Sequence, residues 1–148
     1  MPEISLIPFR LVDQAAVKQL VLAGLAEHFG EIDLTKNPDL NDIAGTYTQA
    51  DFLVAWSDGR IVGCGALVPQ PGQTAQIVRM SVAADMRRQG IARWVLERLV
   101  KIAREKGNRQ VILETTDSWT GVIEFYLACG FRITHYQDGE VYFVLNLL

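Results

Sequence analysis

Hydrophobic residues recur along the chain with two different periods, and these periods predict its strands and helices. Residues 4–11 are rich in apolar side chains that partly alternate, which predicts a strand. Asp13 is suited to cap a helix that runs to about residue 28 and ends before Gly30. The apolar face of this helix consists of Val17, Leu20, Val21, Gly24 and Leu25.

Turn residues separate the next elements. The polar stretch EIDLTKNPD, which contains a proline, predicts a loop, and apolar residues at helical spacing predict a short helix over residues 40–47. Two runs rich in strand-forming residues then flank Ser57-Asp58-Gly59-Arg60. Because Asp-Gly favours a tight turn with positive φ, residues 51–69 are expected to form a β-hairpin.

A further strand, residues 74–82, follows the turn PQPG and leads toward a long helix. This helix is expected from about Gly90 to Lys106. Gly107 comes directly after it, at the position past a helix end where glycine is preferred.

In the last third of the chain, glycines and turn residues again mark the ends of the predicted elements. Residues 109–115 (RQVILET) predict a strand buried on both faces. Residues 118–129 predict a helix that again ends at a glycine, Gly130. Residues 131–136 and 140–147 predict a hairpin across Gln137-Asp138-Gly139.

The predicted elements follow the order βααβββαβαββ, without internal repeats or linkers. Hairpins imply antiparallel pairing and strand–helix–strand crossovers imply parallel pairing. We therefore expect an α/β (α+β mixed) fold: a mixed, mostly antiparallel sheet of six to seven strands with helices on both faces. A chain of 148 residues is most simply one domain, residues 1–148.

Composition narrows the class of protein. Hydrophobic residues make up 49% and charged residues 21%, as in ordinary globular proteins. The net charge of −3 provides no basic field for nucleic acid, no apolar run approaches a membrane span, and the N-terminus lacks a secretory signal. We therefore expect a soluble, cytoplasmic protein without nucleic-acid or membrane partners. Cys64 and Cys129 are expected to be free thiols, and no metal site is expected.

The segment before the long helix has a charge pattern that folding alone does not explain. Arg87 and Arg88 precede a helix N-terminus, where the helix dipole disfavours cations. The first turn of a helix has unpaired N–H groups, while Gly90 and Ala92 leave the backbone beside them open. This combination predicts a diphosphate site. The motifs GxxxxGK[ST] and GxGxxG are absent, which argues against a P-loop or a dinucleotide-binding domain.

Two motifs, about 30 residues apart, occur within this order of elements. VRMSVAADMRRQGIARWVL contains R-x-x-G-x-A, and VIEFYLACGF follows about 30 residues after that turn. Together they make nearly the whole chain resemble the GNAT family of acyl-CoA-dependent N-acetyltransferases. The resemblance implies acetyl-CoA as cosubstrate, with its diphosphate on the N–H groups of residues 88–92 and its pantetheine paired along residues 80–82. The implied binding residues are Met80, Ser81, Val82, Arg87, Arg88, Gln89, Gly90, Ile91, Ala92 and Arg93.

The resemblance also implies a catalytic role for Tyr126. In the family, a tyrosine at this position lies near the sulfur of CoA and protonates the departing thiolate, a role that suits a phenol. The alternative is that Tyr126 only packs its helix against the sheet. The amine would attack the thioester directly, and a backbone N–H of residues 80–82 would polarise the thioester carbonyl.

The general base does not follow from the motifs. Some family members carry a glutamate on the strand before the turn, where this chain has Gln76, a residue without basicity. Glu114 is the first candidate base, and its alternative role is a buried carboxylate bonded to neighbouring backbone or to Arg79. Glu31 and Asp33 are either part of the acceptor pocket or solvated loop charges.

The leading hypothesis is therefore an N-acetyltransferase that moves an acetyl group from acetyl-CoA to a primary amine of a small molecule. Two alternatives stay open: a protein or peptide N-acetyltransferase acting on N-termini or lysines, and a non-catalytic acyl-CoA-binding module. Trp119 either covers the ligand as an aromatic wall or packs in the fold. A homodimer is expected only because dimers are common in the family.

Overall fold

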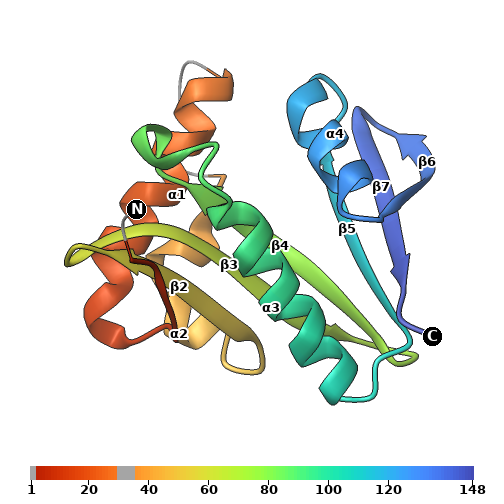
Figure 1. Cartoon of the computed structure of the whole chain (residues 1–148), viewed down its shortest axis with the longest axis horizontal. Helices are drawn as coiled ribbons and strands as arrows, with labels where there is room; N and C mark the ends of the chain where they lie inside the picture. The colour runs from red at the N-terminus through yellow and green to blue at the C-terminus, as the bar shows by residue number, and fades with distance from the viewer. Residues whose placement is uncertain (1–2, 30–35) are drawn as a thin grey trace.

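The computed structural model describes residues 3–29 and 36–148, which form a seven-stranded sheet with helices on both faces (Figure 1). The strands lie in the order β1-β2-β3-β4-β5-β7-β6. Within these residues every neighbouring pair is antiparallel except β4 and β5, which run parallel. The predicted mixed, mostly antiparallel sheet is confirmed.

The elements have the following bounds. The strands are β1 (Ser5–Pro8), β2 (Asp51–Ser57), β3 (Arg60–Gln70), β4 (Thr74–Val82), β5 (Gln110–Thr116), β6 (Arg132–Gln137) and β7 (Glu140–Asn146). The helices are α1 (Gln14–Phe29), α2 (Ile43–Thr46), α3 (Ile91–Glu105) and α4 (Thr120–Ala128). Short 3-10 turns are η1 (Leu11–Asp13), η2 (Pro38–Asn41) and η3 (Ala84–Met86).

Two clusters of buried side chains fill the two faces of the sheet. The larger one joins α3 and α4 to the sheet, and Val95, Leu99 and Phe143 are among its most buried members. The second joins α1 and α2 to residues of β2, β3 and β4. Helices α1 and α2 therefore cover one part of their face, and the part formed by β5, β7 and β6 lies beyond that cluster.

The prediction that β5 is buried on both faces is wrong, because α1 and α2 cover only part of their face of the sheet. Val111, Leu113 and Thr115 are buried toward α3 and α4, but Glu114 on the opposite face is exposed. An apolar run such as VIL is typical of a strand covered on both faces, yet here the second cover stops at β4.

The start of the chain also differs from the prediction. β1 ends at Pro8, and the helical stretch begins with η1, so that Asp13 lies inside the first turn rather than before it. The Asp13 carboxylate accepts a hydrogen bond from the Arg10 N–H at 3.0 Å and is almost completely buried. Asp13 therefore stabilises the helix start from the third helical position, as the acidic residue of a capping box does.

Local turn predictions are confirmed. Asp58 and Gly59, and likewise Asp138 and Gly139, have positive φ angles at the tips of the two hairpins. Gly107 follows α3 with a φ of +83°. Both cysteines are free. In the described ranges, no helix combines the length and the apolarity needed to span a membrane.

Candidate active site

The site is built where β4 and β5 separate. These parallel strands pair only over residues 74–76 and 110–112, and beyond this point they diverge, as Figure 1 shows. A cavity of about 440 Å³ lies at this separation. It is lined from α1 by Val21, Gly24 and Leu25, from β4 by residues 77–82, from β5 by residues 113–116, from the α4 region by Trp119, Gly121, Val122, Phe125 and Tyr126, and by Arg87, Ala92 and Glu140.

A β-bulge in β4 causes the divergence. Cys64 pairs with Ser81 and Ala66 with Val78, so two residues of β4, Arg79 and Met80, lie opposite one residue of β3. Arg79 has a φ of +57°, the left-handed conformation that a bulge of this kind usually assigns to glycine. An extra residue bends the strand that contains it, which turns the end of β4 away from β5.

Gly65 makes room for the bulge. A Cβ on Gly65 would lie 2.4 Å from the Met80 sulfur and 3.0 Å from a methyl group of Val95 in α3. Glycine at this position therefore lets Met80 turn toward α3 while Arg79 turns to the opposite face of the sheet.

The Arg79 side chain is anchored by the segment between α1 and β2. Its Nε and Nη2 atoms donate to the two Asp39 carboxylate oxygens at 2.9 and 2.7 Å, and Nη2 also donates to Asn37 Oδ1 at 3.1 Å. The Tyr47 hydroxyl donates to the same Asp39 at 2.6 Å. Burial alone would raise the pKa of Asp39, but hydrogen bonds from Arg79 and Tyr47 hold it below its ordinary value. Burial together with the bond to Asp39 raises the pKa of Tyr47 to about 12.

The turn before α3 has the geometry expected of an anion site. Gly90 occupies the N-cap position with a φ of +82°, and the first turn has no side-chain cap. Arg88 is also left-handed, with a φ of +62°, and a Cβ on Gly90 would meet no protein atom within 4 Å. The N–H groups at the start of α3 are therefore left for a ligand.

The residues predicted to bind acetyl-CoA divide into three groups. Met80, Ser81, Val82, Arg87 and Ala92 line the cavity. Arg88, Gln89, Gly90 and Arg93 are exposed around the turn outside it, and the Ile91 side chain is buried in the core. Arg87 donates to Glu27 of α1 at 2.5 Å, so an ion pair links α1 to the turn. Their contacts with acetyl-CoA stay a prediction.

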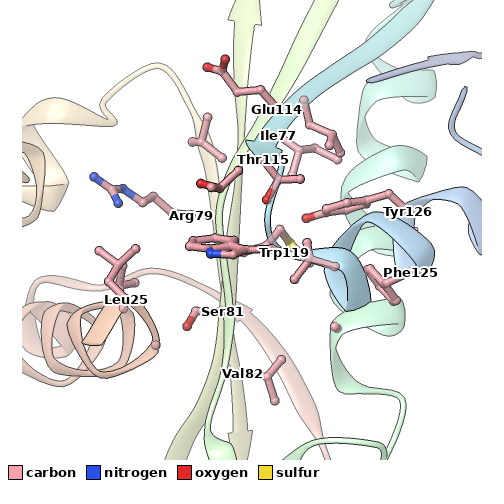
Figure 2. Close-up of a pocket in the computed structure, with 18 of the residues that line it drawn as sticks. Leu25, Ile77, Arg79, Ser81, Val82, Glu114, Thr115, Trp119, Phe125 and Tyr126 are labelled. Atoms are coloured by element: carbon pink, nitrogen blue, oxygen red, sulfur yellow. The ribbon is translucent and has the colours of Figure 1, made fainter. Parts of the chain in front are cut away.

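Tyr126 is buried, yet its hydroxyl reaches the cavity. Its ring packs against Phe125, Phe131 and Phe143 with centroid distances of 5.2 to 5.8 Å. Within the described part of the chain the hydroxyl makes no hydrogen bond, and Figure 2 shows it directed into the space between β4 and β5. Burial raises the pKa of Tyr126, so the phenol is held in its protonated form. This orientation of the Tyr126 side chain is compatible with both roles, packing and proton donation.

Glu114 borders the cavity but is not the buried carboxylate considered as its alternative role. Its side chain is exposed, and Arg79 bonds Asp39 instead. A hydrogen bond to Glu114 raises the pKa of Tyr142, which lies opposite it on β7. In Figure 2 the Glu114 carboxylate is directed away from Tyr126, so a proton would have to reach it through water.

The remaining candidates have simple outcomes. Trp119 lines the cavity, and its indole lies between Arg79 and Tyr126 in the view of Figure 2, while its contact with a ligand stays a prediction. Gln76 accepts a hydrogen bond from Gln70 at 3.1 Å where β4 and β5 are still paired. Glu31 and Asp33 lie outside the described residues. No group of side chains in the described ranges could hold a metal ion.

The sequence reasoning missed the Arg79–Asp39 pair. One signal was present: the two glycines in VGCGALV, since glycine inside a strand marks a bulge or a close backbone approach. A Cβ on Gly63 would lie 3.0 Å from Ile91 at the start of α3, and Gly65 faces Met80. These glycines locate the bulge, but they do not identify the partner of Arg79.

Comparison with known proteins adds independent findings. The model of the acetyltransferase (GNAT) family matches residues 19–131. Rat N-acetyltransferase 8F1 is 34% identical over 103 residues, which cover 65% of this chain and 47% of that protein. Human N-acetyltransferase 8 is 30% identical over 111 residues, 70% of this chain and 49% of that protein. The chain thus spans about half the length of the curated relatives it matches.

Solved structures show the same fold. An acetyltransferase of the GNAT family from Staphylococcus aureus superposes with a TM-score of 0.90 at 21% identity, over 99% of this chain and 100% of that one. The PaiA N-acetyltransferase from Thermoplasma acidophilum, solved in complex with coenzyme A, gives 0.85 at 16% identity, over 97% and 99% of the two chains.

Proposed function

This chain belongs to the GNAT family of acetyltransferases, and from that premise we propose that it transfers an acetyl group from acetyl-CoA to a primary amine of a small molecule. One observation carries the proposal: the cavity at the separation of β4 and β5 extends to the uncapped N-terminus of α3. In acetyl-CoA the thioester and the diphosphate are at different ends of the pantetheine arm. The thioester fits in the cavity, and the diphosphate fits at the N-terminus of α3.

In the proposed binding mode, the N–H groups of residues 88–92 hold the diphosphate. The cavity-lining residues of β4, Met80, Ser81 and Val82, offer backbone N–H and C=O groups to the pantetheine, since β4 has no strand partner on this side beyond Gln76. The PaiA enzyme, which has this fold, was solved with coenzyme A. Arg88 adds positive charge near the diphosphate, whereas Arg93 is paired with Glu97 one turn along α3.

The proposed reaction is a direct attack. The nitrogen of the neutral amine forms a bond to the thioester carbonyl carbon, and the carbon–sulfur bond breaks. The thiolate that leaves takes a proton from the Tyr126 hydroxyl, which lies at the cavity with no other hydrogen bond in the described residues. The nitrogen, which becomes positively charged on attack, loses one proton through water as the amide forms, and a proton from water restores the Tyr126 phenol. A backbone N–H of residues 80–82 stabilises the negative charge that develops on the carbonyl oxygen.

The amine must first lose a proton, because an alkylammonium has a pKa of about 10.4. We propose Glu114 as the group that takes this proton through water. Support comes from its place on the rim of the cavity and from its exposure to solvent.

A small acceptor is favoured over a peptide by the size of the cavity. About 440 Å³ is within the usual range of small-molecule sites. A protein acceptor, the second candidate, requires an open groove there instead.

The test is to incubate the protein with acetyl-CoA and a panel of amines while free thiol is measured, with peptides assayed in parallel. Thiol release that depends on a free amine supports the proposal. Turnover on peptides alone makes the protein a peptide acetyltransferase. Binding of acetyl-CoA without transfer to any acceptor makes it a binding module, and no binding at micromolar concentrations contradicts the account altogether.

A further inference from the structure

Arg79 occupies a backbone position that does not suit its residue type. Its φ of +57° lies in the left-handed region, which glycine adopts without cost and which a long side chain disfavours. The local backbone would therefore be better served by glycine, so the reason for arginine is found in the contacts of its side chain.

These contacts all lead to one segment. Both Asp39 carboxylate oxygens and the Asn37 side-chain oxygen accept hydrogen bonds from Arg79, and Asp39 is 40 residues away in sequence. Tyr47 bonds the same carboxylate from the end of that segment. The Arg79 and Asp39 side chains are only 20% and 19% exposed, and a forked arginine–carboxylate contact has a strict geometry.

The direction of the side chain separates positioning from ligand binding. Arg79 lines the cavity, but Figure 2 shows its guanidinium directed away from Tyr126, toward the side of the cavity opposite α4. The charge is already neutralised by Asp39. The stem of Arg79 thus borders the cavity, while its charged end is bonded to Asn37 and Asp39, which are not among the residues that line it.

From this geometry we propose that Arg79 is a positioning residue: its bonds to Asp39 tie residues 37–47 to the bulge of β4 and fix the stem of Arg79, which lines the part of the cavity that receives the acceptor amine. This inference rests on the proposed acetyl transfer. Because the bulge itself depends on Gly65 and on positive φ, loss of the ion pair frees the stem of Arg79 and residues 37–47 and leaves the acetyl-CoA side of β4 in place.

Two variants test the pair from its two sides. Arg79→Gly keeps the left-handed backbone and removes the side chain, and Asp39→Asn removes the charge that Arg79 binds. Each is expected to raise the KM for the acceptor amine about tenfold, with the KM for acetyl-CoA changed less than twofold. The double variant is expected to be no worse than the more severe single variant, because both changes remove one interaction. Arg79→Lys, which keeps the charge without the fork, is expected to give an intermediate acceptor KM.

Asp51→Asn is the matched control. It breaks the ion pair of Asp51 with Lys106, whose N···O distance of 2.6 Å is similar, but neither residue lines this cavity. Both KM values are expected to stay unchanged. Hydrogen exchange on the free protein gives a second readout: Arg79→Gly and Asp39→Asn should speed amide exchange over residues 38–47, whereas Asp51→Asn should not.

The outcomes distinguish this inference from the proposed function. If the intact protein transfers acetyl groups but the variants change both KM values equally or neither, Arg79 is not a positioning residue. Unchanged exchange over residues 38–47 overturns the inference as well, with or without turnover. If the intact protein acetylates no amine, the proposed function fails, and the acceptor role of Arg79 fails with it.

Discussion

The two ends of helix α3 treat their free backbone groups in opposite ways. At the C-terminal end, the N–H of Asn108 donates to Ala103 O at 3.0 Å and the N–H of Gly107 donates to Arg104 O at 3.1 Å. This is the Schellman arrangement, in which the chain satisfies the last carbonyls of its own helix. The cation Arg104 in the last turn also suits the negative end of the helix dipole.

The N-terminal end has none of these features. Gly90 provides no side-chain cap, the first turn contains no acidic residue, and Arg87 and Arg88 precede it. Both ends use a glycine with nearly the same φ, +82° at Gly90 and +83° at Gly107. One glycine therefore ends a helix whose last carbonyls the chain itself satisfies, whereas the other leaves free N–H groups, to which we assign an anion.

The same contrast separates two tyrosines, the half-buried Tyr47 and the buried Tyr126. The Tyr47 hydroxyl bonds Asp39 at 2.6 Å, whereas the Tyr126 hydroxyl has no partner among the described residues. Among the described residues the buried side-chain atom without a hydrogen-bond partner is Trp56 Nε1, which does not line this cavity, so burial alone does not mark a ligand site. The Tyr126 hydroxyl is assigned to acetyl-CoA because it lies at the cavity.

The largest effect is expected from Tyr126→Phe. The change keeps the ring packing and removes the proton that the thiolate needs, so kcat should fall about 100-fold, at the lower end of what general acid catalysis contributes. The dissociation constant for acetyl-CoA, measured by calorimetry, should stay within twofold. Tyr136→Phe, at a tyrosine that is 63% exposed and outside the cavity, is the matched control and should leave kcat unchanged. An unaltered kcat in Tyr126→Phe would remove this residue from the mechanism.

The next largest effect is expected from changes at Gly90 and Gly107, the two glycines that flank α3. Gly90→Ala and Gly107→Ala both force alanine into positive φ, so each should lower the free energy of unfolding by about 1–2 kcal/mol. Only Gly90→Ala should weaken acetyl-CoA binding, by about tenfold or 1.4 kcal/mol, because its new methyl group stands where the diphosphate approaches. Denaturant unfolding and calorimetry measure the two quantities separately. Equal losses of affinity in the two variants would break the contrast between the helix ends.

A smaller effect with opposite signs is expected from two arginines. Arg88→Gln removes a cation near the positive end of the α3 dipole and should raise the free energy of unfolding of the free protein by about 0.3 kcal/mol, while Arg104→Gln should lower it by a similar amount. Acetyl-CoA affinity should fall in Arg88→Gln alone. If both changes shift the free energy of unfolding in the same direction, Arg88 does not destabilise the N-terminus of α3.

The smallest effect concerns alkaline pH. Burial raises the pKa of Tyr126 above its usual value of about 10, so the phenol stays protonated, and able to donate, through pH 10. Initial rates of the intact protein should therefore lose less than twofold through this group between pH 8 and 10. A tenfold fall over that interval that is absent in Tyr126→Phe would show that the hydroxyl ionises earlier.

The sequence predicted those features that neighbouring residues determine. The hairpins at Asp58-Gly59 and Asp138-Gly139 and the end of α3 at Gly107 depend on positive φ within a few residues, and glycine reports such positions directly. The place of Tyr126 on the cavity followed from the GNAT resemblance, because the motif fixes its position relative to the helix end.

Features that depend on distant partners could not be predicted. The exposure of Glu114 depends on where α1 and α2 stop covering the sheet, and the role of Arg79 depends on Asp39, which no local pattern connects to it. Asp13 was misplaced by three positions because the helical stretch begins with Leu11 in a 3-10 turn. For Glu114 and Arg79, contacts between distant parts of the chain decided what the local pattern left open.

The central claim is that the free N–H groups at the start of α3 bind the diphosphate of coenzyme A. The most direct measurement is a pair of NMR titrations that follow the amide signals of Gly90, Ile91 and Ala92 during addition of coenzyme A and, separately, of pantetheine, which has no diphosphate. We expect these three amides to shift with coenzyme A and not with pantetheine, while amides of residues 80–82 shift with both. Signals at residues 90–92 that stay fixed as coenzyme A saturates the protein would contradict the central claim.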